Sequence, residues 1–155
     1  MPALKEGAKA PDFSLQTDTH GTVSLKDFAG KKLALYFYPK DDTSGCTAEA
    51  CAFNDYLPKF GKLKTAVLGI SRDTAKKHEK FREKYDLGFP LGADEDGSVC
   101  EKYGVWVEKS MYGRKYMGIE RSTFLIDETG KILKIWRKVK VTGHVEEVME
   151  AAKDA

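Results

Sequence analysis

The chain has 155 residues but only three cysteines, and it has no long apolar run. An odd and sparse set of cysteines cannot build the disulfide framework of a small secreted scaffold, so we expect a reducing, cytoplasmic compartment. The longest apolar runs span a few residues, as in 33–37, whereas a bilayer span needs about 20. The first residues show no apolar stretch behind a basic cap, so we expect no secretory signal and no membrane partner.

An excess of charge of one sign is also lacking. Lys plus Arg number 26 and Asp plus Glu number 24, for a net charge of +2. So balanced a chain gives no electrostatic reason to bind nucleic acid, and we expect no nucleic-acid partner. The hydrophobic fraction of 41% and the charged fraction of 32% are ordinary for a globular protein, and the length predicts one domain over residues 1–155.

The sequence signatures of bound cofactors are missing as well. Neither a Gly-x-Gly-x-x-Gly pattern nor a phosphate-binding loop pattern occurs, so no nucleotide cofactor is indicated. His20, His78 and His144 stand far apart and off any ligand spacing, so we expect no metal site. No Cys-x-x-Cys occurs, which disfavours a dithiol reductase of the thioredoxin type.

Alternating strand and helix patterns are what the chain does contain. We expect a hairpin turning at 19–22, strands at 33–38, 65–70, 89–91, 122–126 and 132–141, and helices at 46–60, 74–85, 98–103 and 143–153. Pro58 is expected to loosen the last turn of the first helix and Gly61 to end it. In the last strand, alternation places Leu133, Ile135, Val139 and Val141 on one face. This order predicts an α/β fold, a mixed sheet flanked by helices in a thioredoxin-like arrangement with an N-terminal β-hairpin.

The segment most informative about chemistry is 38–51, where a buried strand is followed by a short loop and a helix. Cys46 falls in the first turn of that helix, where unpaired N–H groups and the helix dipole favour thiolate over thiol. If Thr43 is the N-cap, its hydroxyl is expected to accept the Cys46 N–H. A cysteine on an apolar helical stripe is most often a small buried hydrophobe. The strand-end loop, the helix start and a second cysteine at position 51 favour a reactive thiol instead.

Four segments together resemble the peroxiredoxin family. Residues 39–46 carry its active-site pattern Pro-x-x-x-Thr-x-x-Cys, and 46–51, Cys-Thr-Ala-Glu-Ala-Cys, is similar to the PrxQ branch, also called bacterioferritin comigratory proteins. Residues 7–13 resemble the family's opening segment, and 121–127 resemble the strand that brings its active-site arginine. The resemblance covers essentially the whole domain and implies the peroxiredoxin type of thioredoxin-like fold.

The resemblance also implies the roles of two cysteines. Cys46 would be the peroxidatic cysteine, which attacks the O–O bond of a peroxide and becomes a sulfenic acid. Cys51 would be the resolving cysteine, closing a disulfide that thioredoxin then reduces. The implied activity is a thioredoxin-dependent thiol peroxidase for hydrogen peroxide and organic hydroperoxides, needing no cofactor. Members of this branch are often monomeric, so a monomer is expected.

Four more residues take roles from the same resemblance. Thr43 would hydrogen-bond the peroxide oxygen and the sulfur, and Arg121 would hold the thiolate and stabilise charge on the leaving oxygen. Pro39 would shield the pocket from water. Glu49 would orient the planar guanidinium of Arg121 as its carboxylate partner.

Two other functions stay open beside the enzyme. One is a thiol redox sensor, which would oxidise at the same cysteines and pass the signal to a partner protein. The other is a thioredoxin-like binding module in which Cys46 is only structural, which would need neither Arg121 nor Thr43. Cys100 is expected to be a packing residue, with an accessory resolving thiol as the alternative, and residues 106–117 are expected to form a loop.

Overall fold

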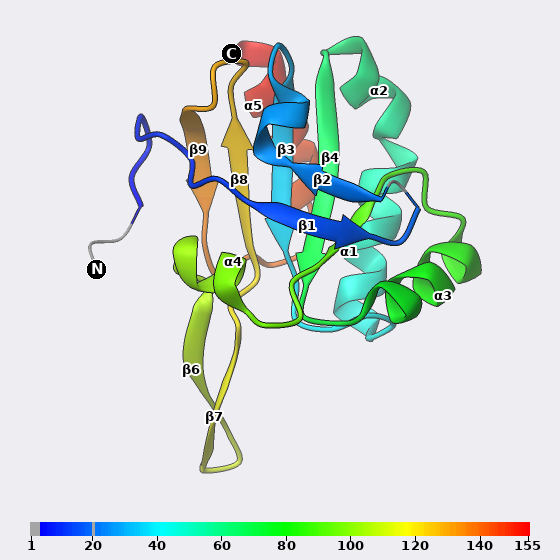
Figure 1. Cartoon of the computed structure of the whole chain (residues 1–155), viewed down its shortest axis with the longest axis vertical. Coiled ribbons are helices and arrows are strands. Elements are labelled where there is room, and N and C mark those ends of the chain that lie inside the picture. The colour runs from blue at the N-terminus through cyan, green and yellow to red at the C-terminus, as the bar shows by residue number, and fades with distance from the viewer. Residues whose placement is uncertain (1–3, 20) are drawn as a thin grey trace.

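A seven-stranded mixed sheet forms the centre of the computed structural model, which describes residues 4–19 and 21–155 (Figure 1). His20 and residues 1–3, on which predictions were made, lie outside the described residues. The strand order is β2-β1-β5-β4-β3-β8-β9. The strands are β1 (Ser14–Thr17), β2 (Thr22–Ser24), β3 (Lys32–Phe37), β4 (Thr65–Ser71), β5 (Leu91–Ala93), β8 (Ser122–Ile126) and β9 (Ile132–Trp136). Strands β3, β4 and β5 are parallel and the other pairings are antiparallel, so the predicted mixed sheet and N-terminal hairpin are confirmed.

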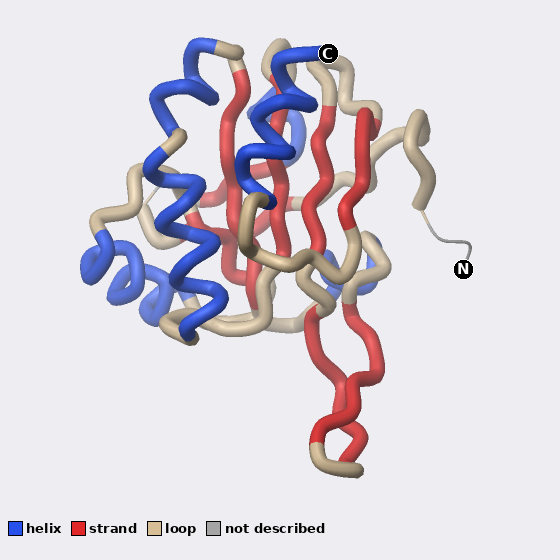
Figure 2. Tube along the Cα trace, turned by 180° about the vertical axis from the view of Figure 1, so that it is seen from behind, coloured by secondary structure: helices blue, strands red, loops and turns tan. Residues whose placement is uncertain are grey.

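Helices cover both faces of this sheet. They are η1 (Leu25–Phe28, a 3-10 helix), α1 (Ser44–Asp55), α2 (Leu57–Lys62), α3 (Ala75–Tyr85), α4 (Ser98–Lys102) and α5 (His144–Asp154). Helices α1, α2 and α5 lie over one face (Figure 2), whereas η1 and α4 lie over the other (Figure 1). No helix in the described part of the chain is long and apolar enough to cross a membrane.

Strand β3 separates two hydrophobic cores. Leu33, Leu35 and Phe37 point into the core that α4 covers. The residues between and after them, Tyr36 and Tyr38 among them, point into the core under α1 and α5. A strand covered on both faces reads as an unbroken apolar run, so the predicted central strand is confirmed.

The single helix predicted over 46–60 is wrong, because the chain forms two helices there. Helix α1 ends at Asp55, and α2 begins at Leu57 with Pro58 in its first turn. Proline suits that place, since the first helical N–H groups have no intrahelical partner to lose. Gly61 lies inside α2, which ends at Lys62.

The last strand is shorter than predicted, and its buried face differs. Strand β9 ends at Trp136, and an irregularity in its pairing with β8 shifts the register, so that Ile132 is buried and Leu133 is exposed. The chain then leaves the sheet, and the Val139 N–H donates to the Arg121 carbonyl at 3.0 Å. This segment therefore runs beside Arg121.

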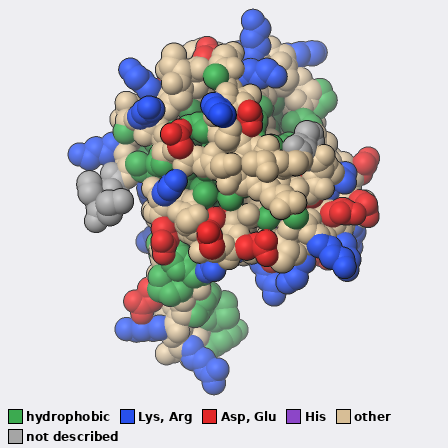
Figure 3. Space-filling model, viewed as in Figure 1, with side chains coloured by type: hydrophobic (Ala, Val, Ile, Leu, Met, Phe, Trp, Pro, Cys, Tyr) green, Lys and Arg blue, Asp and Glu red, His purple; other side chains and the backbone are tan. Residues whose placement is uncertain are grey.

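The predicted loop over 106–117 is a β-hairpin instead. Strands β6 (Trp106–Met111) and β7 (Arg114–Ile119) form a separate two-stranded ribbon that projects from the body (Figure 1). Its turn residues, Tyr112 and Gly113, have φ of 53° and 78°. A two-residue turn with positive φ at both positions is the usual hairpin connection, but tyrosine rarely fills it, so the turn was not recognised. Apolar side chains on the ribbon are exposed to solvent (Figure 3).

Candidate active site

Cys46 lies where the end of β3 meets the beginning of α1. Thr43 is the N-cap of α1, and Cys46 is the third residue of the helix, with 1% of its surface exposed. The unpaired N–H groups of the first turn and the positive end of the helix dipole therefore lie at a buried sulfur. The predicted position of this cysteine in the helix is confirmed.

Arg121 contacts both Cys46 and Glu49. Its Nη2 donates to the Cys46 Sγ at 3.3 Å, and its Nη1 donates to the Glu49 Oε1 at 2.6 Å. Antiparallel pairing of β3 with β8, in which Phe37 lies opposite Ser122, brings Arg121 to the end of β3. Residues 38–43, which connect β3 to α1, are called the active-site loop below. The structure thus brings together three of the six predicted site residues.

Gly45 leaves room for this contact, and sequence reasoning missed it. A Cβ atom at this position would lie 3.2 Å from the Arg121 Nη2, which is tighter than ordinary van der Waals contact. Any larger residue would press on the guanidinium that reaches Cys46. Nothing local in the sequence marks this role, because the arginine comes from a distant strand.

The charge state of the arginine–glutamate pair follows from burial. Burial raises the pKa of Glu49 to about 7, although the guanidinium of Arg121 opposes this shift. Burial alone lowers the pKa of Arg121, but the charges of Glu49 and Cys46 outweigh it and leave that pKa raised. Arg121 is therefore a permanent cation, whereas Glu49 titrates near neutrality.

Thr43 and Pro39 lie on the exposed side of the loop. The Thr43 hydroxyl donates to the Lys40 carbonyl at 3.0 Å and makes no capping hydrogen bond. The predicted bond from the Cys46 N–H to this hydroxyl is therefore wrong, because the loop carbonyl engages the side chain instead. Pro39 follows the buried Tyr38 and is itself exposed.

Cys51 lies on the same helix as Cys46. It is half-buried. The pKa of its thiol is raised, mainly by burial and also by the negative charge of nearby Asp55. Both cysteines are free, and α1 runs without a break from Ser44 to Asp55. Five residues of regular helix separate two Cα atoms by about 8.6 Å, beyond the roughly 7 Å limit for a disulfide. The intact helix holds these cysteines apart.

Cys100 lies on the other side of the sheet. It belongs to the core beneath α4, whereas Cys46 belongs to the core beneath α1 and α5. The pKa of the Cys100 thiol is raised far above its ordinary value, mainly by burial and also by the Asp94 carboxylate. Its position fits the packing role predicted for it.

A pocket of about 440 Å³ opens between the β6–β7 hairpin and the active-site loop. Its lining combines apolar side chains, three cations, one carboxylate and a glycine: Pro39, Lys40, Arg72, Glu95, Trp106, Lys109, Tyr116, Met117, Gly118 and Ile119. The pKa of Lys109 is lowered, first by burial of its amino group and then by the positive charge of Arg121. The negative charge of Cys46 opposes this shift. Lys109 therefore lies within electrostatic reach of the reactive centre. It was missed because it falls in the predicted loop.

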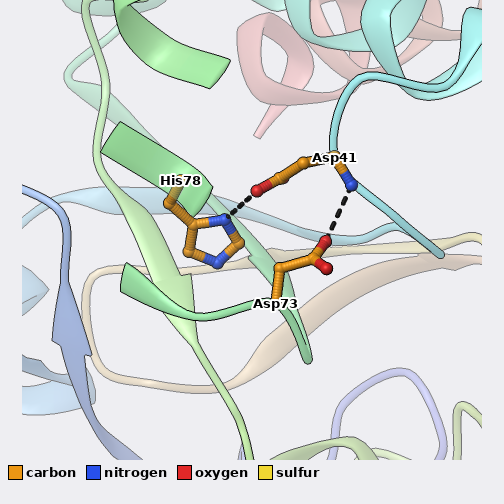
Figure 4. A group of neighbouring side chains, drawn as sticks. All are labelled: Asp41, Asp73 and His78. Atoms are coloured by element: carbon orange, nitrogen blue, oxygen red, sulfur yellow. Dashed lines mark hydrogen bonds and ion pairs between the residues drawn. The ribbon is translucent and has the colours of Figure 1, made fainter. Parts of the chain in front are cut away.

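A second polar cluster lies at the base of the active-site loop (Figure 4). Ligand-type atoms of Asp41, Asp73 and His78 all lie within 4.8 Å of one another. His78 Nδ1 is 2.6 Å from the Asp41 Oδ2, and His78 Nε2 is 2.9 Å from the Gly92 carbonyl. Sequence spacing gave no sign of this cluster, since its members come from two loops and a helix.

Comparison with known proteins identifies similar sequences over nearly the whole chain. The profile of the AhpC/TSA family matches residues 7–135. A bcp protein of Coxiella burnetii is 55% identical over 147 residues, which are 95% of this chain and 97% of that protein. Peroxiredoxin Bcp of Bacillus subtilis is 50% identical over 151 residues, covering 97% of this chain and 96% of that protein.

Solved structures agree with the sequence comparison. A cysteine-to-serine mutant of Xylella fastidiosa PrxQ superposes with a TM-score of 0.93 at 40% identity, covering 99% of this chain and 98% of that one. The bacterioferritin comigratory protein of Xanthomonas campestris gives a TM-score of 0.87 at 44% identity, covering 92% and 90%. That protein is described as having alkyl peroxide reduction activity.

Proposed function

Because the chain belongs to the AhpC/TSA family, as a peroxiredoxin of the Bcp or PrxQ type with a thioredoxin-like fold, we propose that Cys46 is the thiol on which it reduces peroxides. The protein is a thiol peroxidase that takes peroxide substrates and a thiol reductant. One observation carries the assignment of Cys46. Its buried sulfur accepts a hydrogen bond from Arg121 at 3.3 Å, while Glu49 holds the same guanidinium.

The first chemical step is attack of the Cys46 thiolate on the terminal oxygen of the hydroperoxide. The S–O bond forms as the O–O bond breaks, and the bonding pair leaves with the second oxygen. That oxygen takes up a proton to give an alcohol or water, and the sulfur is oxidised to a sulfenic acid. Arg121 stabilises the negative charge as it moves from sulfur to the leaving oxygen, because its donors are fixed before the reaction begins.

Three other residues support this step. Glu49 fixes the plane of the Arg121 guanidinium through the 2.6 Å hydrogen bond. Pro39, at the mouth of the loop, limits access of water to the sulfur. Thr43 donates its hydroxyl to the bound peroxide, and for this the side chain leaves the Lys40 carbonyl to which it now donates.

Cys51 completes the catalytic cycle in this proposal. Its thiol gives up a proton and attacks the sulfenic sulfur of Cys46, the sulfenic hydroxyl takes up a proton and leaves as water, and an intramolecular disulfide forms. A dithiol protein, thioredoxin, then reduces the disulfide by thiol exchange. Because the intact helix α1 keeps the two Cα atoms too far apart, its first turns must unwind between the two steps.

The pocket beside the hairpin supports organic hydroperoxides as substrates. Trp106, Met117 and Ile119 give it apolar walls next to Pro39. An alkyl group bound there would leave its hydroperoxide end toward the active-site loop. We extend to this chain the alkyl peroxide reduction described for the Xanthomonas campestris protein.

The proposal also covers the state of the protein in the cell. We propose a single domain over residues 1–155 that acts as a monomer, since Cys46, Cys51 and Arg121 all come from one chain. The sparse cysteines fit the reducing cytoplasm. Light scattering of the reduced protein at the concentration used in the assays should give the molar mass of one chain, 17.3 kDa.

A coupled assay tests the function directly. Thioredoxin, thioredoxin reductase and NADPH are mixed with the protein and either hydrogen peroxide or an alkyl hydroperoxide, and NADPH loss is followed. We expect multiple turnovers that Cys46→Ser abolishes while the circular dichroism spectrum is unchanged. Turnover by the Cys46→Ser variant would disprove the assignment, and a single oxidation without turnover would indicate the redox sensor instead.

A further inference from the structure

The active-site loop between β3 and α1 is fastened to helix α3 at two successive residues. The Asp41 Oδ2 lies 2.6 Å from the Nδ1 of His78. The carboxylate of Asp42 accepts hydrogen bonds from Lys84 Nζ at 2.9 Å and from the Tyr85 hydroxyl at 2.8 Å. These five residues are called the α3 clamp below.

The Asp41–His78 contact is the buried half of the clamp. The His78 side chain has no exposed surface, and that of Asp41 is 6% exposed. His78 Nε2 faces the Gly92 carbonyl, which can only accept, and Nδ1 faces a carboxylate. Acceptor oxygens therefore face both ring nitrogens, and the contact of Nδ1 with Asp41 is a hydrogen bond shielded from water.

The other carboxylate oxygen of Asp41 and its main-chain N–H also make hydrogen bonds. The Tyr38 hydroxyl donates to the Asp41 Oδ1 at 2.5 Å. The Asp41 N–H donates to the Asp73 Oδ2 at 2.7 Å (Figure 4), and Ser71 donates to the same oxygen at 3.0 Å. Both the main chain and the side chain of Asp41 are thus fixed five residues before Cys46.

Asp42 is the point at which the chain turns toward α1. Its φ of 60° lies in the left-handed region, which a non-glycine residue adopts at a cost and which aspartate tolerates better than most. Its contacts with Lys84 and Tyr85 are exposed and therefore weaker than the buried contact of Asp41. Helix α1 begins two residues later, at Ser44.

We propose that Asp41 and His78 are positioning residues for the peroxidase reaction, and that the α3 clamp is the fixed hinge on which α1 opens. In the reduced enzyme the clamp holds the loop so that Cys46 lies beside Arg121. On oxidation the clamp stays closed, and the first turn of α1 unwinds beyond Asp42 to bring Cys46 to Cys51. The second half of this inference depends on the disulfide proposed above.

The clamp acts on the first chemical step and not on the second. A loosened clamp leaves Cys46 beside Arg121 for a smaller fraction of the time, so attack on peroxide slows. Unwinding beyond Asp42 does not involve the clamp, so the same loosening does not slow disulfide formation. A residue that only stabilised the fold would not separate the two rates in this way.

Rapid kinetics and hydrogen exchange test the clamp in the full chain. In Asp41→Asn and His78→Gln, we expect the rate constant for hydrogen peroxide attack to fall by about ten- to a hundredfold. The rate constant for disulfide formation should not fall. In the reduced variants, amides over 47–50, of which Thr47 donates to the Thr43 carbonyl at 2.8 Å, should exchange faster than in the parent. This measurement requires neither peroxide nor disulfide.

Arg82→Gln is the matched control. Arg82 lies on the same helix and is paired with Asp18 at 2.5 Å, so it fastens α3 to the β1–β2 hairpin and not to the active-site loop. Both rate constants and the exchange over 47–50 should equal those of the parent. If His78→Gln does not fold, Tyr85→Phe and Lys84→Met test the exposed half of the clamp, with a slowing of attack of about two- to fivefold.

Two results would overturn the inference. One is parent-like attack and exchange in the folded clamp variants, and the other is the same effect in Arg82→Gln. Peptide mapping of the oxidised parent separates this failure from failure of the proposed function. If Cys46 paired with another thiol while the clamp variants behaved as expected, the assignment of Cys51 would fall and the positioning role of Asp41 and His78 would stand.

Discussion

Glu49 accepts a 2.6 Å hydrogen bond from Arg121 through Oε1, while its other oxygen, Oε2, is buried and finds no partner among the described residues. Leaving a buried carboxylate oxygen unpaired is costly, so this glutamate is not placed for stability alone. Its contact fixes Arg121 Nη1 and thereby aims Nη2 at Cys46. The orientation of the guanidinium is therefore set by a residue on the same helix as the reactive sulfur.

Arg121→Lys should reduce the second-order rate constant of peroxide consumption by about a hundred- to a thousandfold. Lysine keeps the positive charge but has no planar fork, so it cannot hold Glu49 and address Cys46 at the same time. Stopped-flow kinetics with hydrogen peroxide measures the loss, and circular dichroism checks the fold. A variant with nearly parental kinetics would show that the arginine is structural.

Glu49 should make the stability of the protein depend on pH near neutrality. Its pKa is about 7 in the folded chain against 4.5 for the ordinary carboxyl group. A raised folded pKa contributes stability that is fully present below the unfolded pKa and is lost as pH rises through the folded one. The free energy of unfolding of the parent relative to Glu49→Gln should thus fall by on the order of 3 kcal/mol from about pH 4.5 to above 7.

Urea unfolding of both proteins across this range measures the difference. Glutamine keeps the shape of the glutamate side chain and a hydrogen-bond acceptor for Arg121, but it does not titrate. The difference in the free energy of unfolding between the two proteins should therefore change with pH and not stay constant. Parallel curves would mean that Glu49 is not protonated in the folded protein at neutral pH.

Local patterns explain why much of the fold was predictable. The apolar run of β3 identifies a central strand, and the loop that follows it places Cys46 at a helix start. The contact of Arg121 with Cys46 followed from family resemblance alone. Its distance depends on the pairing of β3 with β8, which brings together residues 75 positions apart in the sequence.

Features that depend on tertiary contacts were not predictable from local patterns. Helix α3 carries many charges, and no local pattern singles out His78 among them as a residue buried beside Phe81. The Thr43 hydroxyl could accept the Cys46 N–H or donate to a carbonyl of the loop. The path of the loop decides between them and places the Lys40 carbonyl within reach. The hairpin was missed because a tyrosine occupies a turn position that usually belongs to asparagine or glycine.

Tyr112→Asn should therefore stabilise the β6–β7 hairpin. Tyr112 is 99% exposed, so its side chain contributes little packing, and its φ of 53° is costly for tyrosine. Asparagine before Gly113 gives the preferred sequence of this turn, with a gain of about 0.5–1 kcal/mol in local stability. Hydrogen exchange over 106–119 should slow in Tyr112→Asn and quicken in Tyr112→Val. The reverse order would contradict the turn assignment.

Cys51→Ser should stop recycling through the intramolecular disulfide and let the sulfenic acid of Cys46 accumulate. The reason is that no other thiol lies on the same face of the sheet, since Cys100 is buried in the opposite core. A sulfenic-acid trapping reagent followed by mass spectrometry measures the product. Cys100→Ser serves as the control and should change neither turnover nor the disulfide.

Closure of the Cys46–Cys51 bond also requires α1 to lose its first turns, because the regular helix sets the Cα atoms about 8.6 Å apart. Amides over about 47–54 should be protected from exchange in the reduced enzyme and lose that protection on oxidation. Peptide mapping of the peroxide-treated parent should find Cys46 linked to Cys51. A dominant link from Cys46 to Cys100, or exchange that oxidation leaves unchanged, would overturn both the assignment of Cys51 and the unwinding that it requires.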